Sequence, residues 1–217
     1  MTRNPSLRKL PDEERRFSVA DATWQWASSI GLAIAVGIVY FLAARFSLSL
    51  LTKPDGVAVF WPASGVAAGV LIALGPRAKW PVAVGAAAAT IAANLLGDRS
   101  FAGAVTFALC NAGEAMITAG VIERQFGSSF ALDRVRQVLG LLAAAVLGSA
   151  ISGIGGALGF KLFHFSTAPI LTVWQHWFAS DALGILTVAP LLIGAAAAAR
   201  DPPPLNQTLE GLQHFSR

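Results

Sequence analysis

The sequence predicts an all-α, polytopic membrane helix bundle with about six transmembrane helices. Of its 217 residues, 55% are hydrophobic and only 13% are charged. The mean hydropathy is +0.61. Long apolar runs alternate with short connections that contain charged residues, glycine or proline. These properties separate the chain from soluble domains of similar length.

The expected spans are six apolar runs, most of them close to or above the roughly 20 residues that cross a hydrocarbon core. In chain order they cover about residues 26–51, 57–74, 80–96, 101–122, 138–163 and 168–199. The second begins with an aromatic pair and Pro62, a residue that suits the first turn of a helix. The sixth is longer than a bilayer requires, so we expect it to tilt, to extend into the interface or to bend at Pro190.

Three regions follow from this division. Residues 1–28 are charged and lack the apolar core and cleavage site of a signal peptide, so they are predicted to be a cytoplasmic lead-in. Residues 29–199 form the integral membrane domain, and residues 200–217 form a cytoplasmic tail or the start of a downstream region.

The basic residues predict the orientation of the bundle. With six spans, twelve of the 16 lysines and arginines fall on the side that carries both termini. The other side receives only Arg45, Lys53, Arg99 and Lys161. The positive-inside rule therefore predicts that both termini are cytoplasmic.

Two carboxyl groups within the spans are the strongest candidates for function. Glu114 and Asp181 each lie about 13 residues into a span that enters from the outer side, or roughly 20 Å deep. An unpartnered charge at that depth costs several kcal/mol. Both side chains are therefore expected to face the bundle interior.

Further polar and aromatic residues are expected near or above the same depth, where they would form an outward-opening pocket with aromatic walls. The predicted lining residues are Asn111, Asn94, Ser64, Trp61, Trp177 and His176. Arg45, at the outer end of the first span, is a candidate ion-pair partner for the carboxyls. The alternative is structural: the Asn and Ser side chains would bond neighbouring helices, the Trp rings would lie in the interfacial belt, and His176 would reach toward water.

The sequence does not predict a cofactor, a metal site or catalysis. The single cysteine, Cys110, and the three histidines do not have the spacing of metal ligands. The glycine-rich run at residues 153–159 follows no predicted strand, so it is not a dinucleotide loop. Gly148, Ser152 and Gly156 are spaced by four residues and instead predict a helix-packing face. The basic residues do not form one stripe, which argues against nucleic acid as a partner.

Several short motifs occur in a fixed order: Phe-Trp-Pro-Ala-Ser-Gly at 60–65, Gly-Pro-Arg at 75–77, Ala-Asn-Leu-Leu-Gly at 93–97, Asn-Ala-Gly-Glu-Ala at 111–115 and Asp-Ala-Leu-Gly at 181–184. The series resembles the first class of membrane-associated sensor domains, known by the acronym MASE, over about residues 30–199. This resemblance implies a sensory input module in the bacterial inner membrane, linked in cis to a cytoplasmic histidine kinase or diguanylate cyclase. It thus implies two-component or cyclic-di-GMP signalling and a homodimer. Such domains usually have about eight spans, whereas this sequence predicts about six.

We therefore expect a membrane sensory domain that binds an unknown small ligand from the outer side and signals inward through the last span. Two other functions fit the sequence. One is the six-helix substrate-binding component of a vitamin transporter, and the other is a structural membrane anchor whose carboxyls only hold helices together.

Overall fold

The computed structural model describes residues 12–51, 56–127, 130–163 and 165–200, and the fold is all-α as predicted. Six α-helices and one turn of 3₁₀-helix follow one another along the chain. They are α1 (Asp12–Leu48), α2 (Pro62–Leu74), η1 (Pro76–Ala78), α3 (Lys79–Leu95), α4 (Phe101–Phe126), α5 (Val135–Leu162) and α6 (Ile170–Arg200).

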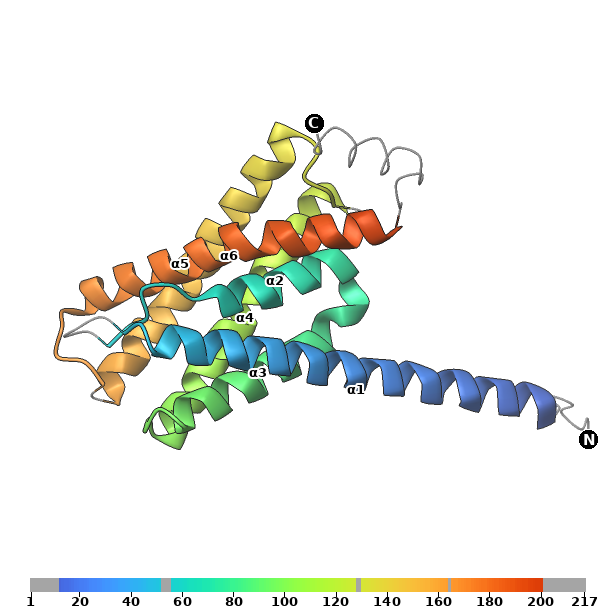
Figure 1. Ribbon diagram of the computed structural model, residues 1–217, viewed down its shortest axis with the longest axis horizontal. Coiled ribbons are helices and arrows are strands. Elements are labelled where there is room, and N and C mark those ends of the chain that lie inside the picture. Colours follow the sequence, from blue (N-terminus) through green and yellow to red (C-terminus); the bar gives the residue numbers. More distant parts are fainter. Residues whose placement is uncertain (1–11, 52–55, 128–129, 164, 201–217) are drawn as a thin grey trace, which may run out of the picture.

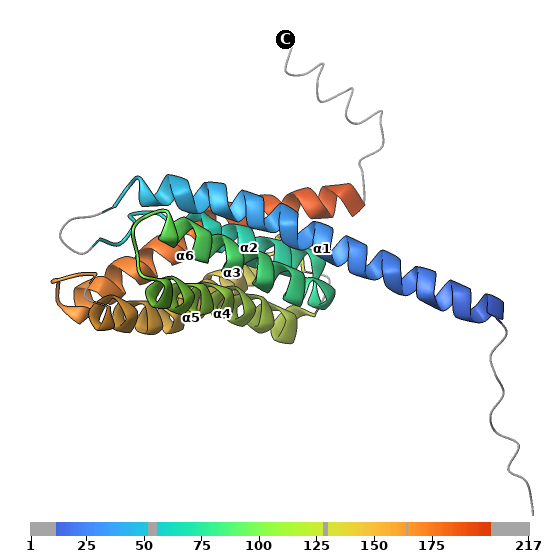
Figure 2. The ribbon, with the colours of Figure 1, turned by 90° about the horizontal axis from the view of Figure 1, so that it is seen from below.

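The helices run alternately in opposite directions through one bundle (Figure 1). Helices α1, α3 and α5 end on the left of Figure 1, and we call this side the loop end. The first residues of α1 and the last residues of α6 lie toward the opposite end, and α1 projects beyond the other helices there (Figures 1 and 2). The second part of the lead-in predicted at residues 1–28 is therefore continuous with the first span.

Within the part of the chain that the structure describes, four helices are long and apolar enough to cross a membrane. They are α1 from Gln25 onward, α4, α5 and α6. The second and third predicted spans form shorter helices, with 13 residues in α2 and 17 in α3. At 1.5 Å per residue, α2 is only about 20 Å long, less than the hydrocarbon thickness.

The second predicted span is shorter than expected because its helix begins only at Pro62. The preceding residues are not helical, and Ala58 forms an isolated antiparallel bridge with Leu51. The proline suits this position, since it has no N–H to leave unpaired at a helix start. The backbone N–H of Trp61 donates to the carbonyl of Ser180 on α6 at 3.3 Å. Irregular backbone inside the bundle thus has a partner, as an apolar environment requires.

The distribution of side chains fits a lipid environment. Large apolar residues cover the outside, including Leu109 and Leu191, which are 69% and 71% exposed. The interior contains many alanines and a set of buried polar side chains that includes Glu114 and Asp181. In water the exposed apolar surface would be unfavourable. In lipid it contacts acyl chains while the polar groups remain inside.

The small-residue face predicted on α5 packs within the bundle. A Cβ atom on Gly148 would lie 2.3 Å from Oγ1 of Thr118 on α4, and one on Gly156 would lie 2.4 Å from the ring of Trp177 on α6. Ser152 lies between them and accepts a hydrogen bond of 3.2 Å from Nε1 of Trp177. These residues allow α4 and α6 to approach α5 closely.

Candidate ligand site at the loop end

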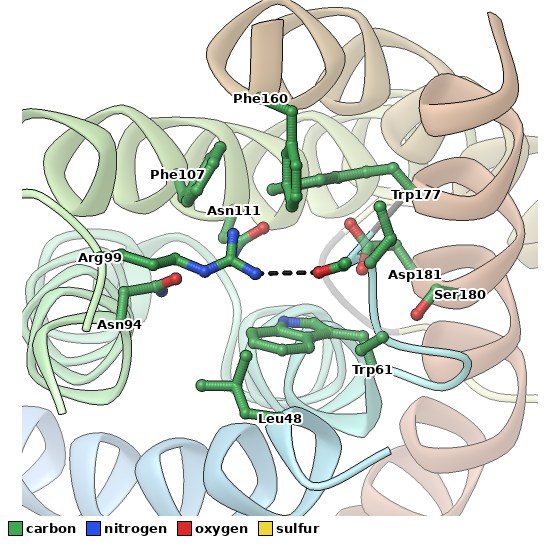
Figure 3. A pocket seen from close by; sticks show the side chains of 13 residues that line it. Leu48, Trp61, Asn94, Arg99, Phe107, Asn111, Phe160, Trp177, Ser180 and Asp181 are labelled. Carbon is green, nitrogen blue, oxygen red and sulfur yellow. Dashed lines mark hydrogen bonds between the residues drawn. The ribbon is translucent and has the colours of Figure 1, made fainter. Parts of the chain in front are cut away.

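A cavity of about 30 Å³ lies inside the bundle toward the loop end (Figure 3). All six α-helices, or the residues next to them, contribute to its lining. Examples in chain order are Leu48, Trp61, Asn94, Phe107, Phe160 and Trp177. A water molecule needs about 10–15 Å³ by this measure, so the cavity has room for roughly two. Because every helix borders the cavity, a shift of one helix changes its shape.

Arg99 extends into the cavity from the connection between α3 and α4 (Figure 3). Its Nη2 donates a hydrogen bond of 2.9 Å to the carbonyl of Gly56. The guanidinium carbon lies 4.7, 5.3 and 5.4 Å from the ring centroids of Phe160, Phe107 and Phe165. These distances fall within the range of cation–π attraction. Burial lowers the pKa of Arg99 to about 10, so the guanidinium is still charged at neutral pH.

Asp181 extends into the cavity from α6, on the side opposite Arg99 (Figure 3). Its Oδ2 is buried and has no hydrogen-bond donor among the described residues. The same is true of Oδ1 of Asn111, and Oγ of Ser180 is also buried without a partner. The three residues are only 2–3% exposed and all line the cavity. Buried polar atoms normally have partners, so this combination identifies a place where a ligand or ordered water would bind.

Glu114 lies beside Asp181 and belongs to a second polar layer. Its Oε2 accepts a hydrogen bond of 2.6 Å from Ser64 on α2, and its Oε1 accepts one of 2.5 Å from Ser149 on α5. Its carboxyl also contacts that of Asp181. The network therefore joins four helices through one side chain of α4. Glu114 does not line the cavity itself but supports the position of Asp181.

Trp61 forms part of the cavity wall at the start of α2. It is 8% exposed, and its Nε1 donates to the hydroxyl of Tyr40 at 3.3 Å. Helix α2 begins directly after this residue, at Pro62, and the indole lies inside the bundle and not in an interfacial belt.

The structure brings most of the predicted site residues together. Five line the cavity, namely Asp181, Asn111, Asn94, Trp61 and Trp177. Glu114 and Ser64 form the adjacent layer. Asn94 also donates to the carbonyl of Thr90 at 2.8 Å, a bond within its own helix.

Two predicted residues lie elsewhere. His176 is exposed on α6 and does not line this cavity. Arg45 is exposed on α1 and donates to the carbonyl of Ala93 at 3.4 Å. Among the residues that the structure describes, the only ion pair joins Lys79 and Glu123, at 2.7 Å, so Arg45 does not pair with either buried carboxyl. Nor do the described residues contain a group of three side chains suited to a metal ion.

Sequence reasoning missed Arg99, its phenylalanine neighbours and Ser180. In the sequence, Arg99 belongs to a short connection between two apolar runs and serves only as a topology signal. The sequence offered one signal. Arg99 directly precedes Ser100, the N-cap residue of α4, and therefore lies close to a helix start. The phenylalanines gave no signal, because aromatic residues are common on lipid-facing surfaces as well as inside bundles.

Comparison with known proteins identifies the family. The MASE1 family model matches residues 32–216. The chain belongs to the MASE1 family. No curated protein and no solved structure matches it. The match confirms the resemblance to this family that the short sequence motifs indicate. The chain is a MASE1 membrane sensor module, and no catalytic domain is found in it. The cavity and its polar layer are therefore features of a sensor domain.

Proposed function

We propose that this MASE1 domain is the input module of a bacterial signal-transduction protein, and that the cavity at the loop end binds a small ligand from the outer side. The carrying observation is that Asp181, Asn111 and Ser180 present buried, unpartnered polar atoms to one cavity. A purely structural network would pair such atoms internally, as Glu114 is paired with Ser64 and Ser149. The family assignment favours this interpretation over a vitamin transporter component.

The proposed orientation places both termini in the cytoplasm and the loop end outside. The distribution of basic residues supports it, since twelve of the 16 lysines and arginines lie on the side of the termini. In this orientation the cavity is accessible from outside the inner membrane. The four candidate spans and the shorter helices α2 and α3 together would form the membrane domain.

The proposed route of the signal is α6. This helix contributes Trp177, Ser180 and Asp181 to the cavity and continues through Pro190 to Arg200, at the other end of the bundle. There Arg200 donates to the carbonyl of Ala73, near the end of α2. The helix has 31 residues and is about 46 Å long, enough to connect the two sides of a membrane. A ligand would shift α6 only if it favoured one of two arrangements of the bundle.

The test is a signalling assay with a cytoplasmic diguanylate cyclase fused after the chain. Cyclic-di-GMP is measured in cells that express the parent fusion or the Asp181→Asn variant at equal membrane abundance. We expect the variant to change output by several-fold, because it replaces the buried carboxyl group at the cavity while conserving shape. Glu123→Gln is the control, since Glu123 lies in a partly exposed ion pair with Lys79. Unchanged output from Asp181→Asn at equal abundance would contradict the proposal and favour a structural anchor.

A further inference from the structure

The chemistry of the cavity identifies a class of ligand, an inference that rests on the proposed function. Three unpartnered oxygen atoms line the cavity, from Asp181, Asn111 and Ser180. The first is a carboxylate oxygen and the second an amide oxygen, and both accept hydrogen bonds. A hydroxyl oxygen accepts as well. A primary ammonium group offers three N–H donors, one for each of these atoms.

The surroundings also favour a positive charge at this place. Asp181 and Glu114 are both buried, and their carboxyls are in contact. Neither forms an ion pair with a basic residue in the described part of the chain. Aromatic rings border the same cavity, including those of Trp61, Phe107 and Trp177. An ammonium group would interact with the carboxylate and with the faces of nearby rings.

Arg99 indicates that the ligand also carries a negative charge. Its guanidinium lines the cavity and has no acidic partner within 4 Å among the described residues. The hydrogen bond to Gly56 uses only one of its five N–H groups. A bare metal cation or a simple amine would place a second positive charge in the cavity beside Arg99. A carboxylate would instead pair with it, and arginine is well suited to that contact.

The size of the cavity sets a condition on the bound state. About 30 Å³ is enough for roughly two water-sized groups, so an amino acid, with at least five heavy atoms, fits only if side chains around the cavity move apart. The carboxylate would then lie nearer Arg99, which comes from the α3–α4 connection at the loop end. We propose that the loop-end cavity binds a small zwitterion, an amino acid, with its ammonium at Asp181, Asn111 and Ser180 and its carboxylate at Arg99.

The experiment measures binding to the purified full chain in lipid nanodiscs by titration calorimetry. Three probes share a three-carbon skeleton: β-alanine carries both charges, propylamine only the ammonium and propionate only the carboxylate. Glycine and 4-aminobutanoate vary the distance between the charges. We expect one of the zwitterions to bind at least about tenfold more tightly than propylamine and propionate, since each charge-assisted hydrogen bond contributes at least that factor.

Variants separate the two ends of the ligand. Asp181→Asn should abolish detectable binding, and Arg99→Gln should weaken zwitterion binding about tenfold or more while leaving propylamine binding unchanged or stronger. Ser180→Ala removes one acceptor with little change of volume and should weaken binding several-fold even if Asp181→Asn folds poorly. Asp98→Asn is the matched control, because Asp98 is exposed on the same connection as Arg99 and asparagine tolerates its positive φ of 59°.

Several outcomes would overturn the inference. One is equal binding of propylamine and the best zwitterion. Others are binding of propionate alone or stabilisation of the chain by sodium alone. The last is that no zwitterion binds at millimolar concentration, which would leave ordered water as the occupant. These results are distinct from failure of the proposed function. If no zwitterion binds but Asp181→Asn alters cyclase output, the sensor function stands and the ligand class is wrong. If a zwitterion binds without altering output, the ligand class stands and the sensory role is wrong.

Discussion

Gly65 on α2 lies directly against Gly184 on α6. A Cβ atom on Gly65 would be 2.1 Å from the carbonyl oxygen of Gly184, and one on Gly184 would be 2.0 Å from the carbonyl oxygen of Trp61. No side chain fits between these backbones. The start of α2 is thereby held against the part of α6 that carries Asp181, so the two helices should move together when a ligand binds.

The first prediction concerns this close approach. Gly184→Ala should lower the free energy of unfolding by about 1–3 kcal/mol, because the added methyl group meets backbone atoms and the helices must separate. Thermal unfolding of the purified chain in detergent measures the effect. Gly194→Ala is the control on the same helix, where a Cβ would have nothing within 4 Å. It should leave stability unchanged or raise it by up to about 1 kcal/mol, because alanine is the better helix former. Equal effects of the two variants would argue against the tight α2–α6 contact.

The second prediction concerns the support of Glu114. Ser149→Ala removes the donor to Oε1, a bond of 2.5 Å, and leaves that oxygen buried without a partner. We expect a loss of about 1–3 kcal/mol of stability, the range for leaving a buried polar atom without a partner. Thermal unfolding again provides the measurement, and Ser64→Ala should behave similarly because Ser64 donates to Oε2.

The matched contrast is Glu123→Gln, which breaks the partly exposed ion pair with Lys79. Such pairs contribute about 0–1 kcal/mol, so this variant should be nearly neutral. If Ser149→Ala were as mild as Glu123→Gln, the interior network would not hold the helices together.

Much of the fold could be predicted from the sequence because lipid imposes simple constraints. Apolar length predicts the helices α1, α4, α5 and α6, and the polar residues Glu114 and Asp181 had to face inward. Their contact follows from equal depth in two spans that run in the same direction. These conclusions need only helix rise and the cost of burying charge.

The start of α2 and the role of Arg99 could not be predicted in the same way. Hydropathy counts residues 57–61 with the second span, because it does not distinguish an extended apolar segment from a helical one. The position of the Arg99 side chain depends on its packing against the rings of Phe107 and Phe160, and Phe160 is far from it in the chain. In the sequence, the basic residues between spans act only as topology signals. Depth alone favours Arg45 as an ion-pair partner, but its side chain lies on an exposed face.

The third prediction tests the orientation of the bundle. The sequence has one cysteine, so a Cys110→Ala background carries no thiol. Leu96→Cys introduces an exposed thiol at the loop end, and Arg77→Cys introduces one at the opposite end. In intact spheroplasts, a membrane-impermeant maleimide should label the first variant and not the second. Labelling of both after permeabilisation controls for reactivity. The reverse pattern would place the loop end in the cytoplasm and the cavity on the inner side.

The fourth prediction concerns the environment of Arg99. Arg99→Lys retains the charge but loses the planar group that contacts three phenylalanine rings at 4.7–5.4 Å. We expect a loss of about 1–2 kcal/mol in stability, because this cation–π contact is largely desolvated. Arg136→Lys is the control: Arg136 is exposed, and its guanidinium lies 5.6 Å from the single ring of Phe126. That variant should cost less than about 1 kcal/mol. Thermal unfolding of the two variants in the same detergent measures both losses. Equal losses of stability would mean that the aromatic rings around Arg99 stabilise it no more than a single surface contact does.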